Sequence, residues 1–279
     1  MRDLPLHPEY TGAGAAGWTP GSHGGVRIMK LGALPRSCDC CEVRLATPLR
    51  HLETVDLDRI GRSRIAHRYE RGHILHYEGT PCTGVLCIYS GLAKVYRSAP
   101  GDRTYILHLA GPGTLLGLES CIVGKLHATT AEMVEPGVVC HHERAVFELL
   151  VRERPEIARL LLEALVENLR TSQAERAELA VGDAREKVAR VLVRLARRYG
   201  IAAAEGVRLG VPLTRQEIAE MAGTATETTI RQLTLFRDQG LLESVGRELV
   251  LLKPEHLARI AHLPAAGSAP EPDRDHVRL

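Results

Sequence analysis

The sequence changes its hydrophobic period near Pro155, and this change constrains the fold more than any other feature. Between residues 69 and 142, short β-branched or aromatic runs alternate with turn residues, and glycines recur at intervals that suit strands of roughly five residues. Such punctuation favours an antiparallel roll or sandwich. After Pro155 the apolar residues recur every three or four positions, which is the helical period. We therefore predict an α+β fold in which an antiparallel β-roll precedes a helical unit.

The strand-like runs lie at 85–89, 92–96, 105–109 and 138–140. The tripeptide Pro100-Gly101-Asp102 separates two of them and is predicted to form a hairpin turn.

A long helix is predicted to follow the roll. Its seam residues alternate at spacings of four and three, as in a two-stranded coiled coil: Ala158, Leu162, Leu165, Leu169, Ser172, Arg176 and Leu179. Because such a helix is over about 30 Å long, one small unit cannot bury both of its sides. We therefore expect a homodimer whose interface includes the seam positions from Leu162 to Arg176. Asp183 then follows Gly182 as the cap of a further helix at 184–199.

A helix-turn-helix is predicted near the C-terminus. Thr214 and Glu217 have the spacing of a capping box, and Gly223 ends the short helix that they begin. A second helix begins near 224–226, and its apolar face is predicted at Ile230, Leu233, Leu235 and Phe236. Residues 241–252 resemble a β-hairpin wing. In this motif the second helix enters the major groove of DNA by its N-terminal residues.

Those N-terminal residues are Thr226, Glu227 and Arg231. Arginine can bind guanine and glutamate can accept from cytosine, although a Glu–Arg pair four apart is also an ordinary surface ion pair. Residues 212–253 contain five Lys or Arg against six Asp or Glu. Phosphate contacts are therefore expected from Arg215, Arg237 and Arg247, with Arg185, Lys187 and Arg190 of the preceding helix as further candidates.

The charge balance favours no partner by itself, since 36 Lys and Arg oppose 34 Asp and Glu. No apolar run is long enough to span a membrane and no signal peptide is evident, so we expect a cytoplasmic protein. An enzyme is the least favoured class. His73 and His76 would point to opposite faces of a strand, which does not suit a cupin-like metalloenzyme.

Seven cysteines occur, and three of them, Cys38, Cys40 and Cys41, lie within one short segment. In a reducing compartment such a group indicates a metal or redox site rather than structural disulfides. Zinc and a thiol–disulfide switch remain open. Cys140, alone on an apolar strand, is more typical of a small core residue than of a ligand. Cys82, Cys87 and Cys121 are interpreted as core residues in the same way, with Cys121 as the reserve ligand.

The order of these parts resembles the CRP/FNR family of bacterial transcription regulators. The resemblance covers roughly residues 38–262, with Gly111-Pro112-Gly113 and Leu116-Gly117 in the roll and Glu227 and Arg231 four apart in the recognition helix. It implies a cyclic-nucleotide-binding-like roll, a homodimer, palindromic double-stranded DNA with TTGA- or GTGA-like half-sites, and contact with RNA polymerase. Ile230 stands where the FNR branch has serine.

The resemblance also implies candidate sensors. His127 and Ala128 replace the Arg-Ser pair that holds the cyclic phosphate in the cAMP-binding branch, so no cAMP is expected. The FNR branch binds a [4Fe-4S] cluster, and Cys38, Cys41 and Cys140 match three of its ligands. The remaining position is Thr47, so the fourth ligand is Cys40, Asp39, Glu42 or an external group. A thiol redox switch, haem or a small effector remains the alternative.

The predicted organisation has five parts. They are a disordered tail at 1–37, the cysteine loop and roll at 38–150, the dimerisation helix at 155–181, the winged helix-turn-helix at 184–262 and a second disordered tail at 264–279.

Overall fold

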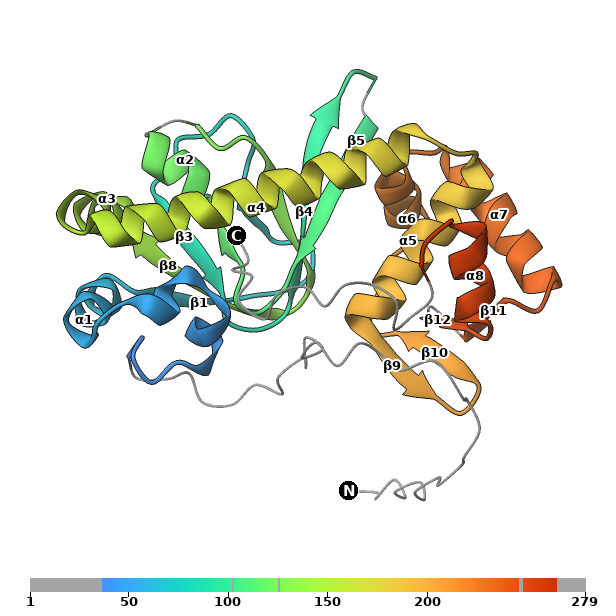
Figure 1. Cartoon of the computed structure of the whole chain (residues 1–279), viewed down its shortest axis with the longest axis horizontal. Helices are drawn as coiled ribbons and strands as arrows, with labels where there is room; N and C mark the ends of the chain where they lie inside the picture. Colours follow the sequence, from blue (N-terminus) through green and yellow to red (C-terminus); the bar gives the residue numbers. More distant parts are fainter. Residues whose placement is uncertain (1–36, 102, 125, 246–247, 265–279) are drawn as a thin grey trace.

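The computed structural model describes residues 37–101, 103–124, 126–245 and 248–264 (Figure 1). Except for Ser37 and Pro264, the two predicted disordered tails lie outside these residues.

Eight strands form two antiparallel four-stranded sheets, with the orders β1-β8-β3-β6 and β2-β7-β4-β5. The strands are β1 (Ile65–Tyr69), β2 (Ile74–His76), β3 (Gly84–Ile88), β4 (Leu92–Ala99), β5 (Arg103–Ala110), β6 (Leu115–Leu116), β7 (Thr130–Glu135) and β8 (Gly137–Glu143). Gly101 adopts a positive φ of 79° between β4 and β5, as a hairpin turn requires. The predicted roll and its four strand-like runs are thus confirmed.

Short helices surround the roll, and the sequence pattern did not predict them. They are η1 (Glu42–Ala46), η2 (Pro48–His51), α1 (Thr54–Arg62), α2 (Leu118–Val123) and α3 (Arg144–Glu153).

Strand alternation gives the sheet β1-β8-β3-β6 two apolar faces. Leu86 and Val139 join the core between the two sheets, which also contains Met133 of β7. Their neighbours Cys87 and Cys140 face the other way, into a second core formed with η2, α1, α3 and the start of the next helix. The N-terminal segment therefore covers the outer face of this sheet.

The long helix α4 (Pro155–Ala180) has 26 residues, about 39 Å at 1.5 Å per residue. Ile157, Leu161 and Ala164 are buried on its inner side, and the first two belong to the core beneath the N-terminal segment. Figure 1 shows α4 crossing the molecule from the roll to the C-terminal unit.

The C-terminal unit contains α5 (Ala184–Tyr199), β9 (Gly200–Ala203), β10 (Gly206–Leu209), α6 (Arg215–Ala222), α7 (Thr226–Asp238), β11 (Leu242–Val245), β12 (Glu248–Leu251) and α8 (Pro254–Ile260). Its strands form one sheet with the order β11-β12-β10-β9. The predicted cap of α5 is confirmed, because Asp183 accepts the backbone N–H of Glu186 at 2.9 Å.

The C-terminal unit packs against the roll. Ile106 and Leu109 of β5 belong to the same apolar core as Leu192 of α5 and Ile218 of α6. The Tyr199 hydroxyl donates to the carbonyl of Leu109 at 3.2 Å. The position of the helix-turn-helix therefore depends on contacts with the roll.

Candidate functional site

Two helices and a tight turn position the predicted DNA-reading surface. The Thr214 hydroxyl accepts the N–H of Glu217 at 3.1 Å, while the Glu217 carboxylate accepts the N–H of Thr214 at 2.8 Å. The predicted capping box at the start of α6 is thus confirmed. Gly223 ends α6 with a φ of +62°, a backbone conformation that favours glycine. The second helix, α7, begins at Thr226.

The inward face of α7 differs in part from the predicted one. Leu233 and Phe236 are buried as expected, but Ile230 is 46% exposed and Leu235 is 43% exposed, so their predicted inward placement is wrong. Thr229 occupies the inward position instead and is fully buried. Its hydroxyl hydrogen-bonds to another threonine at 2.7 Å, so the core tolerates this polar group.

The N-terminal half of α7 exposes side chains that suit base recognition. Glu227, Ile230 and Arg231 are exposed, and Thr226 is half-buried. Residues three or four apart share a helix face, so Glu227, Ile230 and Arg231 form one exposed surface.

Three of the predicted phosphate contacts lie in or beside the helix-turn-helix, and among them Arg237 pairs with Asp238 at 3.3 Å. Arg215 is half-buried and donates to the Ser244 hydroxyl of β11 at 2.9 Å, which ties α6 to the wing. Burial lowers the pKa of Arg215. Arg247 lies outside the described residues.

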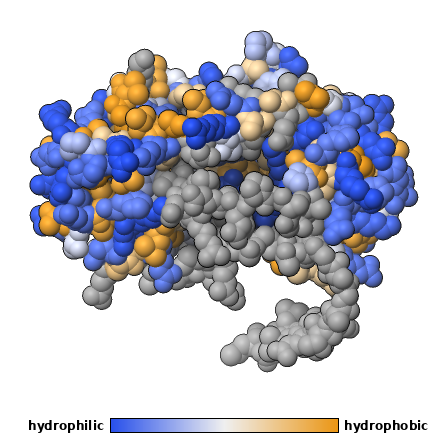
Figure 2. All heavy atoms as spheres, in the orientation of Figure 1, coloured by the Kyte–Doolittle hydropathy of each residue, from blue (hydrophilic) through white to orange (hydrophobic). Residues whose placement is uncertain are grey.

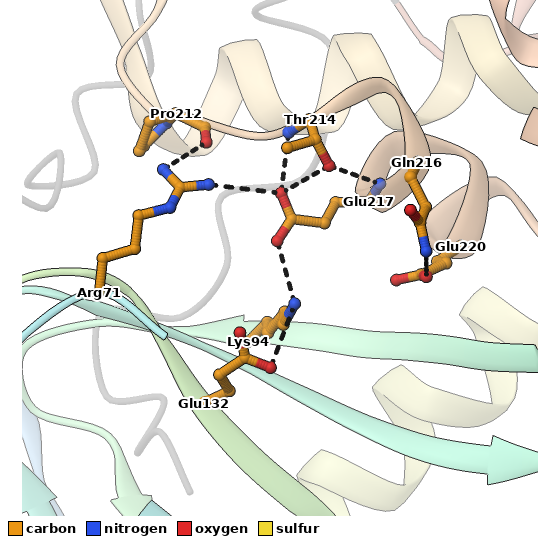
Figure 3. A network of polar contacts seen from close by, with 8 residues as sticks. All are labelled: Arg71, Lys94, Glu132, Pro212, Thr214, Gln216, Glu217 and Glu220. Carbon is orange, nitrogen blue, oxygen red and sulfur yellow. Dashed lines mark hydrogen bonds and ion pairs between the residues drawn. The ribbon is translucent and has the colours of Figure 1, made fainter. Parts of the chain in front are cut away.

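A polar network joins the helix-turn-helix to the roll (Figure 3). The carboxylate that caps α6, Glu217, accepts from the Lys94 ammonium of β4 at 3.0 Å, and Lys94 also pairs with Glu132 of β7 at 3.3 Å. Arg71 approaches Glu217 to 3.9 Å and donates to the carbonyl of Pro212 at 3.1 Å. One side chain therefore serves both the local cap and the contact between units.

The charges in this network reinforce one another. Burial alone lowers the pKa of Lys94, but the hydrogen bond and charge of Glu217, with the charge of Glu132, raise it overall. Burial raises the pKa of Glu217, but the hydrogen bonds from Thr214 and Lys94 lower it overall. Both groups thus stay ionised at neutral pH.

The exposed side of α4 has an apolar stripe at the predicted seam. Leu162 is 61% exposed and Leu169 is 56% exposed, with Val166 between them at 40%. Leu165 and Ser172 are half-buried, and the side chain of Arg176 lies outside the described part of the structure. Figure 2 shows apolar side chains gathered over α2 and the middle of α4.

The predicted cysteine ligands from distant segments come together on the outer face of the roll. Cys140 of β8 lies directly opposite Cys87 of β3, so both thiols point to the same side of the sheet. Cys38 belongs to the same buried core, and Cys41 packs against it.

These thiols lie within electrostatic reach of one another. Burial raises the pKa of Cys140 to about 11, Arg64 opposes this rise, and the thiols of Cys41 and Cys38 add to it. Burial likewise raises the pKa of Cys38, again against Arg64. The nearby guanidinium thus favours the ionised form of two thiols that burial holds neutral.

The described part of the chain has no preformed site for a single metal ion. Among the described residues, no three His, Cys, Asp or Glu side chains lie close enough to hold one ion. Cys40 is exposed and hydrogen-bonds to Ser37. Thr47 is fully buried and caps η2, where its hydroxyl accepts the N–H of Leu49 at 3.1 Å and donates to the carbonyl of Arg44 at 2.8 Å.

The sequence did not indicate that Cys87 lies with Cys38, Cys41 and Cys140. Cys87 was expected to be an ordinary core residue, because only the pairing of β3 with β8 brings it opposite Cys140. Cys87 alternates with Val85 and Tyr89, so the sequence indicated that these three side chains share one face of the strand. It did not indicate which strand pairs with this one, or in which register.

His127, predicted to stand in place of the Arg-Ser pair of the cAMP-binding branch, lies against a second histidine. His127 is buried and stacks on His76 of β2, with ring centroids 4.0 Å apart and planes 9° from parallel. Burial lowers the pKa of His127 and lowers that of His76 to about 4. Both rings are therefore neutral near pH 7.

Within the described residues, no helix is long and apolar enough to cross a membrane.

Two family profiles match the chain. The Crp-like helix-turn-helix domain matches residues 186–260, and the cyclic nucleotide-binding domain matches residues 66–154. They coincide with the winged unit and with most of the roll.

Curated proteins and solved structures agree with these profiles. The chain is 30% identical over 193 residues to the CRP-like cAMP-activated global transcriptional regulator of Mycobacterium tuberculosis, covering 69% of this chain and 86% of that one. It is 27% identical over 238 residues to the transcriptional activator protein anr of Pseudomonas aeruginosa, covering 84% and 96%. The structure of FixK2 from Bradyrhizobium japonicum superposes with a TM-score of 0.62 at 26% identity, covering 73% of this chain and 99% of that one. With the roll and the winged helix-turn-helix, these similarities show that the chain belongs to the CRP/FNR family of DNA-binding transcription regulators.

Proposed function

We propose that this chain is a cytoplasmic homodimer that binds palindromic DNA, contacts RNA polymerase and controls DNA binding through an oxygen- or NO-sensitive [4Fe-4S] cluster. The observation that carries the sensing part is the convergence of Cys38 and Cys41 with Cys140 on one buried face of the roll.

The exposed face of α7 supports direct reading of a TTGA- or GTGA-like half-site. Arg231 can donate to the two acceptors of guanine, and Glu227 can accept from the amino group of cytosine. Exposed Ile230 can contact only an apolar group, and the thymine methyl is the one that the major groove offers. Thr226 would enter the major groove beside them, and Arg215 and Arg247 would add contacts to phosphates.

The apolar stripe of α4 supports dimerisation. Leu162, Val166 and Leu169 follow the helical spacing of a seam, and the opposite side of α4 is already buried against the roll. A second copy that packs along this stripe would cover it and place two recognition helices symmetrically for a palindrome.

The donor chemistry fits an iron–sulfur cluster. Thiolates are the usual ligands of such clusters, and Cys38, Cys41 and Cys140 would supply them here. When bound, the cluster would supply the group that reacts with O₂ or NO.

The N-terminal segment supports a route from the thiols to α4. Arg154, between α3 and α4, pairs with Glu53 at 3.2 Å and with buried Asp56 of α1 at 3.3 Å. Arg59 of α1 pairs with Glu153 at 2.5 Å. A change in how this segment lies on the roll would therefore act on the first turn of the dimerisation helix.

Anaerobic purification tests the cluster. Iron, sulfide and the visible absorbance are measured for the natural protein, for Cys38→Ala and Cys140→Ala, and for Cys121→Ala as a control. Cys121 belongs to the same buried core, but its thiol interacts with that of Cys82. We expect a broad absorbance that air bleaches and that Cys38→Ala and Cys140→Ala lose. A colourless anaerobic protein that still binds its DNA would contradict cluster sensing.

A thiol redox switch without a cluster is the second candidate, and Cys40 favours it. Cys40 is exposed, and its hydrogen bonds with the side chain and backbone of Ser37 lower its pKa, which makes a thiol more readily oxidised. An iron-free protein whose DNA binding changes with oxidant, returns with dithiothreitol and is insensitive in Cys40→Ser would support this candidate.

The cAMP named for the Mycobacterium tuberculosis relative is not proposed as a ligand here. His127 lacks a guanidinium, and burial keeps its ring neutral, so it offers a cyclic phosphate no charge.

A further inference from the structure

The cysteines gathered on the outer face of the roll include two that lie on strands. Cys87 and Cys140 are direct partners in the antiparallel pair of β3 and β8. Directly opposite residues in such a pair have Cβ atoms about 5 Å apart and project to the same side. Two thiols are thus held side by side on a rigid sheet.

The loop thiols lie over the same face. Cys38 shares the buried core that contains Cys87 and Cys140, and it lies next to Gly61 of α1, where an added Cβ would be 3.9 Å from the Cys38 sulfur. Burial raises the pKa of Cys87, and the neighbouring thiols Cys140, Cys41 and Cys38 add to the rise. These four thiols therefore act on one another, whereas Cys82 and Cys121 of the same core act on each other.

The other nearby donors are less suited to complete a ligand set. Thr47 is fully buried, and its hydroxyl already bonds to Arg44 and Leu49 at the cap of η2. Cys40 is exposed and bonds to Ser37. Thr47 holds the loop in place, and Cys40 faces solvent.

We propose that Cys87 is the fourth thiolate ligand of the iron–sulfur cluster, together with Cys38, Cys41 and Cys140. This inference rests on the proposed function, because it names a ligand of the same cluster. Each thiol would release its proton to water as its sulfur binds iron, with no change in the oxidation state of sulfur.

A two-plus-two ligand set has a mechanical consequence. Cys38 and Cys41 belong to the loop, whereas Cys87 and Cys140 belong to adjacent strands. The cluster would then join the loop to the sheet through two attachments on each side. Removal of Cys87 would leave the loop attached to a single strand residue, so it should weaken both iron retention and the order of the loop.

The test compares the full-length natural protein with Cys87→Ser, Cys40→Ser and the control Cys121→Ser. Each protein is reconstituted anaerobically with Fe²⁺ and sulfide and desalted, and iron and sulfide per chain are then measured together with the visible absorbance. Protection of residues 37–51 from hydrogen exchange is compared with and without iron, which gives a readout independent of DNA binding.

We expect the natural protein, Cys40→Ser and Cys121→Ser to hold about four irons per chain. Cys87→Ser should retain at least about tenfold less iron after desalting and should lose the iron-dependent protection of the loop. Full iron loading of Cys87→Ser with loss in Cys40→Ser would overturn the inference in favour of Cys40. Full loading of every variant would overturn it as well.

Two further outcomes remain distinct. A natural protein that binds no iron refutes the proposed cluster itself, and the assignment of Cys87 with it. If Cys87→Ser lowers the apo-protein melting temperature more than Cys121→Ser does, Cys87→Ala replaces it, because alanine keeps a small apolar side chain in the strand. Normal iron binding by a stably folded Cys87→Ala would then refute the inference.

Discussion

The ion pair between Lys94 and Glu217 should couple the sensor roll to the helix-turn-helix. Lys94→Met removes the ammonium that joins β4 to α6 but leaves the capping box of Thr214 intact. Glu217→Gln removes the charge but keeps a residue that can complete a capping box. Together the two substitutions form a double-mutant cycle that isolates the contact between the units.

The magnitude follows from distance and burial. At 3.0 Å, two unit charges attract by about 1.4 kcal/mol in bulk water and by about 5.5 kcal/mol at an effective dielectric constant of about 20. The side chains of Lys94 and Glu217 are only 14% and 9% exposed, so the pair lies nearer the second limit, and the cost of desolvation offsets part of the gain. We expect a coupling free energy of about 2 kcal/mol, typical of a charge-assisted hydrogen bond.

Urea unfolding of the natural protein, both single variants and the double variant measures this coupling. The matched control is a cycle on Arg62 and Asp58, an exposed i,i+4 pair at 2.7 Å, for which we expect less than about 0.5 kcal/mol. A Lys94–Glu217 coupling no larger than that of the control pair would refute the reasoning. The network in Figure 3 would then contribute no more to the free energy of unfolding than an exposed ion pair does.

Three further predictions concern recognition, assembly and pH. Arg231→Ala should weaken specific DNA binding about 10- to 100-fold and relax the preference at one base pair, as fluorescence anisotropy with base-substituted duplexes would measure; an unchanged preference would exclude guanine contact. Leu162→Glu should yield monomers in sedimentation, whereas Val123→Glu, at an equally exposed apolar residue of α2, should not. Burial and the neighbouring His127 lower the pKa of His76 to about 4, against 6.5 for the unfolded ring. Its neutral form therefore supports stability above pH 6.5, and about 2 kcal/mol should be lost at pH 5. His76→Phe should remove that loss from urea unfolding curves, and an equal loss in the variant would contradict the assignment.

Local chemistry made much of the fold predictable. The change of period at Pro155 separated roll from helix, and Thr214 with Glu217 marked the start of α6, because each signal depends on residues close in sequence. The inward face of α7 was less predictable. Thr229 is buried through a hydroxyl pair with Thr224, so a polar residue displaced the expected Ile230 from the core. Hydropathy alone cannot reveal a hydroxyl whose partner lies in the preceding turn.

The four neighbouring cysteines show what could not be predicted from residues close in sequence. Cys38 and Cys41 attract attention because they are close in sequence, whereas Cys87 and Cys140 are related only by the register of β3 on β8. A shift of that register by one residue would place one of these thiols opposite a residue of the other face. The sequence therefore indicated thiol chemistry, and the pairing of strands was needed to count the thiols that take part.

The two control points lie at different distances from the DNA-reading helix. The thiol group borders α1, whose Asp56 pairs with Arg154 at the start of α4, while Glu217 lies within the helix-turn-helix itself. In the proposed mechanism, a change at the thiols would reach the DNA-binding unit through α4, which follows the roll and leads into α5. The Lys94 contact is separate from this route, because it joins β4 directly to α6. A shift of α4 that moves the C-terminal unit away from the roll would have to break this ion pair. The free energy of the ion pair therefore sets how large a free-energy change at the thiols must be to move the recognition helix.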